Sequence, residues 1–454
     1  MAVQINLLTF SNLKQLFISC LNAIFLSRRE SNCTAVYSVS FYDENLDFIE
    51  TAQISGDNIN LSNIKSGLWY KAGEDLPLMA HNLNGDIRLY AVENVIEITK
   101  QHQLNNVRNA LDGKYIILND ILLDEEGAGF EGSNGWKPIG DPFSPFTGTF
   151  NGNSCSITNL WINRPSDDYI GLFGGIENAK IKNLGVEIAE GKDIKGNFEV
   201  GGIAGYINNG AIINSCLNGN INGSYDVGGI AGMAYGDSCI INSCSDGNIN
   251  GDFDVGGIVG FIYSKSRIVN SCSSGNVSGC DKVGGIAGYI GNGVSITNSC
   301  STANVNGSGK YIGGIAGNIK NGSIVNSYSS GNVSGCEYVG GIAGRVECVV
   351  TIKNNAALNP SVAGTNCCNI NRIAGYVEDN STISNNLARS ALPILGFSNF
   401  CDGNANSGIG KTDDELHKKD TYETTLSWRF GDNNDEPWIF DDCSYPMLYW
   451  QNVQ

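Results

Sequence analysis

The feature that most constrains this chain is a segment that repeats along most of its length. The motif Val-Gly-Gly-Ile-Ala-Gly begins at Val200, and an Ile-x-Asn motif follows it in each unit. From Asn214 to Asn354 the asparagines of Ile-x-Asn are 28 residues apart every time. A fixed period of this length is typical of a solenoid, in which each repeat forms one coil and neighbouring coils bury a shared core. With small changes, the first motif returns at Val227, Val255, Val283, Ile312 and Val339.

Each repeat contains three short strand-like segments and no helical periodicity. This pattern predicts an all-β fold, a right-handed parallel β-helix (solenoid) of about nine coils, stacked about 4.8 Å apart. We expect residues 1–100 to form a small N-terminal α+β or β domain, 101–395 the β-helix and 396–454 a C-terminal capping segment. Alternation in residues 35–41 predicts a strand. The run from Thr412 to Glu415 predicts a capped helix start.

Two rows of residues are expected to be structural. In a strand, Ile, Asn and Cys at positions i, i+2 and i+4 share one face, and the apolar ends of that set indicate the interior. The asparagines are then expected to stack as an internal ladder, with exposed turn positions as the alternative. The cysteines are expected to be buried, unpaired thiols, because Cβ atoms about 4.8 Å apart exceed relaxed disulfide geometry. The two rows are Asn214, Asn242, Asn270, Asn298 and Asn326, and Cys216, Cys244, Cys272 and Cys300.

The full repeat unit carries a resemblance to a known family. Val-Gly-Gly-Ile-Ala-Gly-Tyr, followed by Ile-x-Asn-Ser-(Cys/Tyr)-Ser-x-Gly-Asn-Val-x-Gly, resembles the GLUG repeat, and residues 323–335 are close to the family pattern. The resemblance covers roughly residues 115–390. GLUG repeats occur in bacterial surface and adhesin-like proteins and in non-catalytic parts of some IgA-cleaving metallopeptidases. The resemblance therefore implies a β-helix used for display. The cysteine row stands where the family often has Tyr, which weakens the case for an aromatic binding stripe at those positions.

Charge and hydropathy exclude several classes of protein. The 46 acidic residues outnumber the 28 basic ones, and a net charge of -18 disfavours nucleic acid as a partner. Nowhere are there about 18 to 20 uninterrupted apolar residues, so membrane insertion is not expected. Near the N-terminus, Arg28 and Arg29 follow the apolar runs instead of preceding them, so we expect a retained amphipathic helix and no standard signal peptide. The predicted location is the cell surface, the secreted fraction or a virion.

The β-helix has few residues suited to catalysis. His81, His102 and His417 are the three histidines, and all lie outside residues 103–416, so we expect no catalytic residues, no metal site and no cofactor in the repeat. Two adjacent rows precede Val-Gly-Gly and form the candidate ligand-binding residues, one acidic and one aromatic. Stacked carboxylates could serve glycan cleavage, whereas a solvated corner and simple ring packing are the alternatives. The rows are Glu199, Asp226 and Asp254, followed by Lys282, and Phe198, Tyr225 and Phe253.

The sequence favours a non-catalytic adhesion or recognition protein that presents a ligand-binding surface on a rigid β-helix, on a bacterial surface or a phage fibre. The expected partner is a cell-surface glycan or protein, and a homo-oligomer is compatible with the repeat. One alternative is a glycan-cleaving, tailspike-like enzyme that uses carboxylates on the helix flank. The other is a structural spacer.

Overall fold

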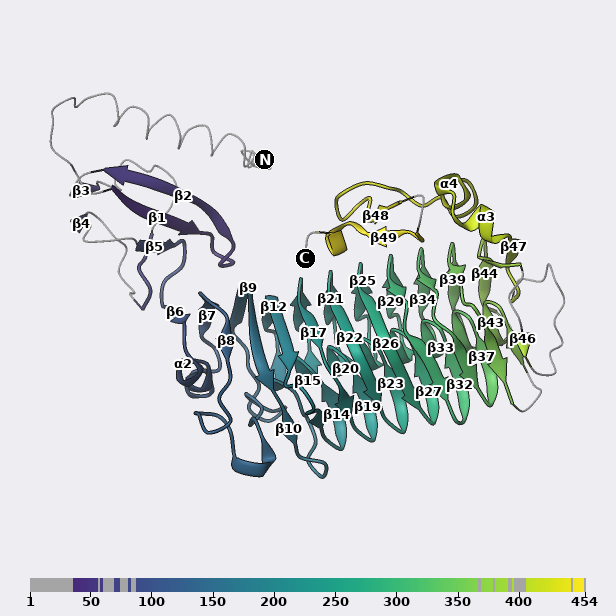
Figure 1. The fold of residues 1–454 in the computed structure, drawn as a ribbon, viewed down its shortest axis with the longest axis horizontal. Coiled ribbons are helices and arrows are strands. Elements are labelled where there is room, and N and C mark those ends of the chain that lie inside the picture. The colour runs from purple at the N-terminus through teal and green to yellow at the C-terminus, as the bar shows by residue number, and fades with distance from the viewer. Residues whose placement is uncertain are drawn as a thin grey trace, which may run out of the picture. The chain divides into compact units, whose positions relative to one another are not determined.

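The computed structural model describes residues 36–55, 58–59, 69–73, 81–82, 87–365, 369–378, 380–390, 394–395, 406–441 and 444–452 (Figure 1). The chain divides into two compact units, Met1–Ile96 and Glu97–Gln454. The amphipathic helix expected before residue 32 lies outside the described residues.

The first unit contains a small β-sheet. The alternating segment predicted as a strand is β1 (Val36–Tyr42), which pairs antiparallel with β2 (Phe48–Ser55) and parallel with β5 (Ile87–Tyr90). A second pair joins β3 (Asn58–Ile59) and β4 (His81–Asn82). Alternation places Val39, Phe41 and Leu89 in the core of this unit, as expected for a sheet with one buried face. β6 (Val95–Ile98) lies at the boundary between the two units in the sequence.

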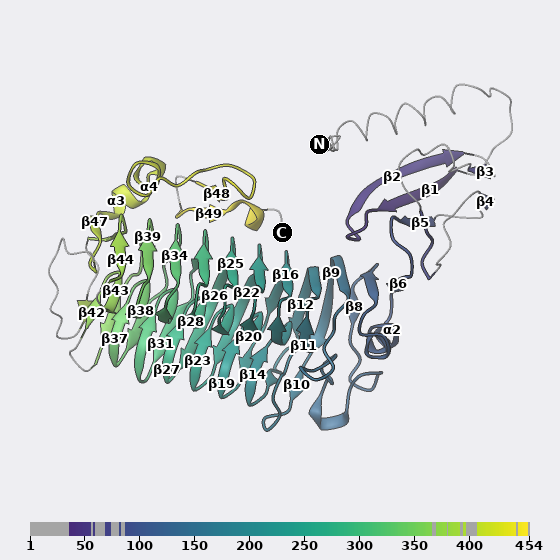
Figure 2. The ribbon, with the colours of Figure 1, turned by 180° about the vertical axis from the view of Figure 1, so that it is seen from behind.

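The second unit is the predicted parallel β-helix, and Figures 1 and 2 show its coils stacked in sequence order. Two of its sheets contain eight and seven strands, which corresponds to about eight coils, slightly fewer than the nine predicted. The eight-stranded sheet consists of β11 (Phe173–Glu177), β15 (Ala204–Asn208), β20 (Ala231–Tyr235), β24 (Val259–Ile262), β28 (Ala287–Gly291), β33 (Ala316–Lys320), β38 (Ala343–Glu347) and β43 (Ala374–Val377). The seven-stranded sheet consists of β14 (Phe198–Gly201), β19 (Tyr225–Gly228), β23 (Phe253–Gly256), β27 (Asp281–Gly284), β32 (Lys310–Gly313), β37 (Glu337–Gly340) and β42 (Ile370–Asn371).

The remaining coil segments join one 27-stranded sheet, which includes β6. Its first strands are β7 (Lys114–Ile117), β8 (Ile121–Leu122), β9 (Thr149–Leu160), β10 (Ile162–Asn163), β12 (Lys180–Ile188), β13 (Ile194–Lys195), β16 (Ala211–Ile213), β17 (Cys216–Asn218), β18 (Ile221–Asn222), β21 (Cys239–Ile241), β22 (Cys244–Asn250), β25 (Arg267–Val269) and β26 (Cys272–Gly279). The others are β29 (Ser295–Thr297), β30 (Cys300–Ser301), β31 (Asn304–Gly307), β34 (Ser323–Val325), β35 (Tyr328–Ser329), β36 (Val333–Gly335), β39 (Thr351–Lys353), β40 (Ala356–Ala357), β41 (Val362–Gly364), β44 (Thr382–Ser384), β45 (Leu387–Arg389), β46 (Ile394–Leu395) and β47 (Ile409–Lys411).

The repeat motif supplies both the core and the close contacts between coils. Its apolar residues point inward at every turn, as Ile203, Ile230 and Ile258 show, each with no exposed surface. The last glycine of the motif has a steric role. A Cβ atom on Gly232 would lie 2.3 Å from the backbone carbon of Glu199 in the preceding coil. Only glycine therefore allows neighbouring coils to approach this closely.

The prediction that the Ile-x-Asn asparagines form an internal ladder is wrong. All five adopt left-handed backbone conformations, with φ between 50° and 53°. Asn214 is exposed, Asn298 and Asn326 are half-buried, and Asn242 and Asn270 are buried. A left-handed residue interrupts the two-residue alternation of a strand, so the following residue turns inward instead. The inner row is serine, and the backbone N–H of each serine donates to the serine hydroxyl of the next coil, except at Ser327, whose N–H donates to the Oδ1 atom of Asn355. This row comprises Ser215, Ser243, Ser271, Ser299 and Ser327, all with no exposed surface.

The asparagines still stack along the β-helix, at an outer corner. Asn242 donates to the Oδ1 atom of Asn214 at 3.0 Å, and Asn354 donates to that of Asn326 at 3.2 Å. The amide of Asn270 donates instead to Asn434 of the C-terminal segment, at 3.2 Å. This corner is therefore a partial amide ladder that also provides an attachment point.

The expectation of unpaired thiols in the cysteine row is also wrong. Disulfides join Cys216 to Cys244 and Cys272 to Cys300, each across one coil. Their Cα–Cα distances are 4.5 and 4.7 Å, inside the range of about 4.4 to 6.8 Å that disulfides tolerate. Adjacent coils are therefore close enough for in-register cysteines to bond.

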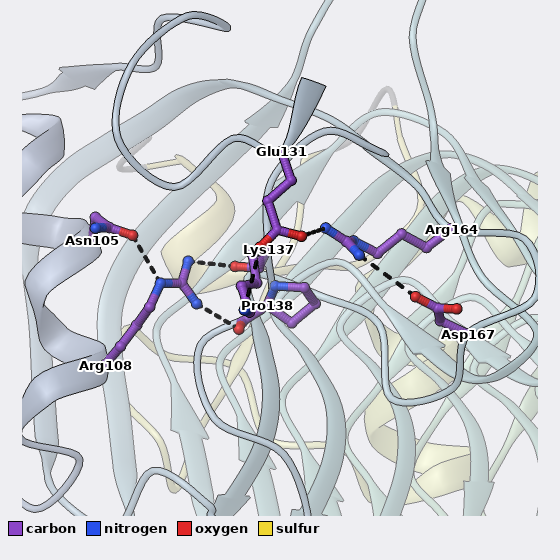
Figure 3. A network of polar contacts seen from close by, with 7 residues as sticks. All are labelled: Asn105, Arg108, Glu131, Lys137, Pro138, Arg164 and Asp167. Atoms are coloured by element: carbon purple, nitrogen blue, oxygen red, sulfur yellow. Dashed lines mark hydrogen bonds and ion pairs between the residues drawn. The ribbon is translucent and has the colours of Figure 1, made fainter. Parts of the chain in front are cut away.

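The first coils lack the regular repeat, and side-chain contacts hold them together (Figure 3). Arg108, which follows α2 (Gln101–Asn106) at η2 (Val107–Asn109), donates to the carbonyl oxygens of Lys137 and Pro138 and packs over the Trp136 ring, 5.0 Å from its centroid. Burial lowers the pKa of Arg108 to about 10. In the same network Glu131 bonds Arg164 at 2.7 Å, near η3 (Gly132–Asn134). These contacts replace the periodic ladders that the irregular coils lack.

The C-terminal segment runs back along the flank of the β-helix, as both views show (Figures 1 and 2). Its predicted helix start is confirmed at α3 (Asp413–Leu416), where Thr412 and Glu415 cap each other. β47 pairs with β45 at the last coil. The other elements are α4 (Lys419–Leu426), β48 (Trp438–Ile439), β49 (Met447–Leu448) and η4 (Tyr449–Asn452).

Tryptophans attach this segment to coils that lie well before the last one. The indole N–H groups of Trp428 and Trp450 donate to the carbonyl oxygens of Asn354 at 2.8 Å and Asn270 at 3.0 Å. Trp428 and Trp438 stack at 4.5 Å, and they pack with Tyr328 and the Cys272–Cys300 disulfide in one buried cluster. The segment therefore covers part of the cysteine row in addition to the end of the solenoid.

Candidate functional site

The six residues predicted to bind ligand come together on β14, β19 and β23. Phe198 pairs in register with Tyr225, and Tyr225 with Phe253. Their rings are nearly parallel, with centroid separations of 4.6 and 5.0 Å and interplanar angles of 7° and 12°. Phe198 is 37% exposed and Tyr225 is 38% exposed. We call these three rings the aromatic ladder.

The acidic residues lie beside the aromatic ladder in an unusual backbone conformation. Glu199, Asp226 and Asp254, which we call the acid row, have φ values of 49°, 53° and 53°. Each interrupts its strand as a bulge does, so the ring before it and the carboxylate both lie outside while the valine after it is buried. Non-glycine residues rarely adopt this conformation, and glutamate has no special tolerance for it.

The acid row is only partly solvated, in contrast to the solvated corner that the sequence left open: Asp254 is buried, and Glu199 and Asp226 are half-buried. Burial, with a smaller contribution from Asp168, raises the pKa of Glu199 to about 7. Burial, followed by repulsion from Asp254 and Glu199, raises the pKa of Asp226 to about 8. Near neutral pH the Asp226 carboxyl is therefore mostly protonated and that of Glu199 is divided between its two forms.

Asp254 differs because a cation accompanies it. It is 8% exposed, and burial raises its pKa while Lys282 opposes that rise. The Nζ atom of Lys282 lies 3.1 Å from Asp254 Oδ1 and 5.2 Å from the centroid of the Tyr289 ring. The acid row thus ends in an ion pair against an aromatic ring.

The outer face of the eight-stranded sheet carries further rings that the sequence analysis did not single out. Phe261 and Tyr289 stack at 4.8 Å with an interplanar angle of 9°, and Tyr235 and Tyr263 stack at 6.1 Å with an angle of 8°. Tyr206, Phe261, Tyr289, Tyr235 and Tyr263 form what we call the aromatic face. Tyr206 and Tyr289 both follow Ile-Ala-Gly in the motif. The return of a tyrosine after this motif is the sequence signal that could have identified the aromatic face.

Other functional features lie elsewhere. A hollow of about 460 Å³ is lined by residues that include Lys114, Lys180 and Asp237, and it contains no member of the acid row. Among the residues that the structure describes, no three His, Cys, Asp or Glu side chains are grouped to hold a metal ion. Within the same ranges, no helix has the length and apolar character to span a membrane.

No protein-family model matches the chain, so the likeness to the GLUG repeat stays a likeness of motif. The chain is similar to a "Putative Gly-rich membrane protein" of Evansella cellulosilytica, with 41% identity over 95 residues, 20% of this chain and 11% of that protein. It is also similar to "Halomucin" of Haloquadratum walsbyi, with 30% identity over 126 residues, 27% of this chain and 1% of that protein. The chain thus spans only a small part of either curated relative.

Two solved structures resemble the fold. One, titled "putative immunoglobulin A1 protease" from Bacteroides ovatus, has 21% identity and a TM-score of 0.42 over 79% of this chain and 93% of that chain. The other, titled "IgA1 Protease", has 15% identity and a TM-score of 0.37 over 65% of this chain and 21% of that chain. At these identities and TM-scores neither resemblance extends to activity.

Proposed function

We propose that this protein is a non-catalytic recognition protein that binds an uncharged glycan through the aromatic ladder and the aromatic face. The observation that carries the proposal is the set of parallel, partly exposed rings held at the spacing of the coils. Tyrosine and phenylalanine on rigid strands supply apolar contact area with little loss of conformational entropy on binding, and tyrosine adds a hydroxyl for hydrogen bonding. A sugar has the matching combination of C–H and O–H groups.

The acid row fits this role because burial keeps it poorly charged. Glu199 and Asp226 have raised pKa values near neutral pH, and Asp254 is paired with Lys282. A surface bordered by protonated carboxyls presents hydrogen-bond donors without a strong negative field. We infer that the ligand carries no strong charge.

For the setting of this activity we propose a cell surface, a secreted form or a virion, with a glycan on another cell as the partner. The similarity to a protein named as a Gly-rich membrane protein supports a surface setting. The exposed rings lie on the seven-stranded and eight-stranded sheets of the β-helix. This placement suits a rod that displays its ligand-binding face outward.

Loss of one exposed ring tests the proposal. Tyr235 is 40% exposed on the aromatic face. Tyr235→Ala should weaken binding to uncharged oligosaccharides, measured by calorimetry on a panel, by at least about tenfold, or roughly 1.4 kcal/mol. The matched control Tyr235→Phe keeps the ring and should stay within about threefold of the parent. Equal affinities for all three proteins, or no binding by the parent, would overturn the proposal.

A glycan-cleaving activity is the second candidate, and one observation favours it. Paired-acid cleavage needs one protonated and one ionised carboxyl group. Asp226, with a pKa of about 8, and Asp254, paired with Lys282, occupy equivalent positions in neighbouring coils. The acid row can therefore separate the two protonation states, which an exposed row of identical acids could not do.

A triple amide variant separates the two candidates. Glu199→Gln, Asp226→Asn and Asp254→Asn together imitate the neutral carboxyls, so a recognition protein keeps its glycan affinity. An enzyme loses turnover. Incubation with polysaccharides and measurement of new reducing ends should detect no cleavage by the parent. Cleavage by the parent that the triple variant abolishes would establish the enzyme instead.

A further inference from the structure

The coils that carry the cysteine row also present a continuous line of asparagine amides. Asn248 donates to the Oδ1 atom of Asn220 at 2.9 Å, and Asn276 donates to that of Asn248 at 2.7 Å. Asn304 donates to Asn276 at 3.3 Å, and Asn332 donates to Asn304 at 3.0 Å. We call these five residues the amide ladder, and all are exposed or half-buried.

The rows on either side of the amide ladder are short and almost free of charge. They run from Asn218 to Ser330 and from Asn222 to Ser334 in steps of 28 residues, and consist of Asn, Ser and Thr with the single carboxylate Asp246. Ser274 donates to that carboxylate at 2.9 Å. In a protein with a net charge of -18, a face with one acid is a distinct surface.

The amides of this face are held in fixed directions. Each asparagine amide has two N–H donors, and Asn248, Asn276, Asn304 and Asn332 each use one of them within the ladder. Backbone pairing places neighbouring residues of one row about 4.8 Å apart along the axis. Two neighbouring rows lie roughly 7 Å apart across the strands. The face is therefore a preorganised array of hydrogen-bonding groups, which reduces the entropy lost on binding.

The composition of the face determines which partner it fits. Stable protein interfaces have cores enriched in aromatic residues, Met and Arg, and the three rows contain none of these. A charged polymer would find no line of opposite charges. A flat, uncharged, hydroxyl-rich surface matches the array in both charge and hydrogen bonding, and many weak contacts along the axis would add together.

We propose that the amide ladder and its flanking rows form a second binding surface, which takes a packed, uncharged polysaccharide. This surface lies on the 27-stranded sheet, whereas the aromatic face lies on the eight-stranded sheet and the aromatic ladder on the seven-stranded one. The proposal therefore goes beyond the recognition function and does not rest on it.

Charge placed on this face tests the proposal with little risk to folding. Thr302 and Asn306 are exposed and flank Asn304 in one coil. The double variant Thr302→Lys and Asn306→Lys should lower retention of the full chain on microcrystalline cellulose and on chitin at least tenfold. The charge-matched control Val349→Lys and Thr382→Lys changes exposed residues elsewhere in the β-helix and should be retained like the parent.

The other outcomes overturn the proposal. These are failure of the parent to bind either solid, and equal retention of the parent and the double variant. Sedimentation of the parent and the double variant tests whether a second copy of the chain is the partner. If only the parent forms a dimer, the face belongs to a protein interface and the proposal is wrong.

Discussion

Two corners of the β-helix adopt the same rare backbone conformation with different residues. At the asparagine corner, every coil from Asn183 to Asn354 places Asn in the left-handed region. At the acid corner the same conformation is adopted by Tyr169, the acid row, Lys282, Tyr311 and Tyr338. Asparagine tolerates left-handed geometry, whereas Glu, Lys and Tyr adopt it at a cost of about 1 to 2 kcal/mol per residue.

The difference indicates that residue type is constrained at the asparagine corner, whereas only the backbone conformation is constrained at the acid corner. The asparagine corner keeps the residue type that suits the backbone, and its amides bond to one another. The acid corner keeps the backbone but varies the side chain, and it buries carboxyls without full compensation. Aspartate also tolerates left-handed geometry, so the strain of this corner is concentrated at Glu199, Lys282 and the tyrosines.

The largest effect is expected at the asparagine corner. Asn242→Val places a β-branched residue in the left-handed region and removes the amide bond to Asn214, so the free energy of unfolding should fall by about 2 to 3 kcal/mol. Asn242→Gly keeps the backbone freedom and should lose only about 1 kcal/mol. Urea denaturation of both variants checks this. Equal losses would show that the backbone conformation does not matter at this corner.

A smaller loss is expected when the cation of the acid corner is removed. Lys282→Met leaves the buried carboxylate of Asp254 without its partner and should lower stability by about 1 kcal/mol at pH 8. The loss should shrink as the pH falls, because burial raises the pKa of the Asp254 carboxyl and the protonated carboxyl does not need a cation beside it. Lys195→Met, which removes the more exposed pair with Asp193, serves as the control and should change stability by less than about 0.5 kcal/mol. A loss that stays equally large as the pH falls would contradict the ion-pair explanation.

The smallest effect concerns the strain itself. Tyr338→Asn and Tyr338→Ala both remove a ring from a left-handed position, where φ is 57°. Because asparagine tolerates this conformation better, the Asn variant should be more stable than the Ala variant by about 0.5 to 1 kcal/mol. Thermal unfolding of the two proteins measures the difference directly. A more stable Ala variant would argue that the acid corner is unstrained.

The sequence predicted the features that depend on periodicity. The 28-residue step established the coils and the parallel sheets. The pairs Phe198 with Tyr225 and Tyr225 with Phe253 followed from the position of each ring before Val-Gly-Gly. Local signals also sufficed for the strand at Val36–Tyr42 and the helix start at Thr412.

Other features depend on geometry that a residue pattern does not contain. Strict alternation assumes an extended backbone, so it assigned Asn214 to the interior, where the structure places Ser215. Close approach of the coils allowed Cys216 to bond Cys244, although uniform spacing argued against it. The attachment of Trp450 to Asn270, 180 residues away in sequence, has no local signal.

The most direct test of this account is the free energy of unfolding as a function of pH, for the parent and for the Glu199→Gln and Asp226→Asn double variant. Both acids have pKa values raised by folding, so the folded state holds more protons than the unfolded state between about pH 4 and pH 8. Their contribution to stability is present below the unfolded pKa and is lost as the pH rises through the folded values. The account predicts that the two proteins are similar near pH 4 and that the variant becomes more stable by about 2 kcal/mol or more at pH 9. A stability difference that does not change with pH would show that folding does not raise the pKa values of these carboxyls, and would contradict the account.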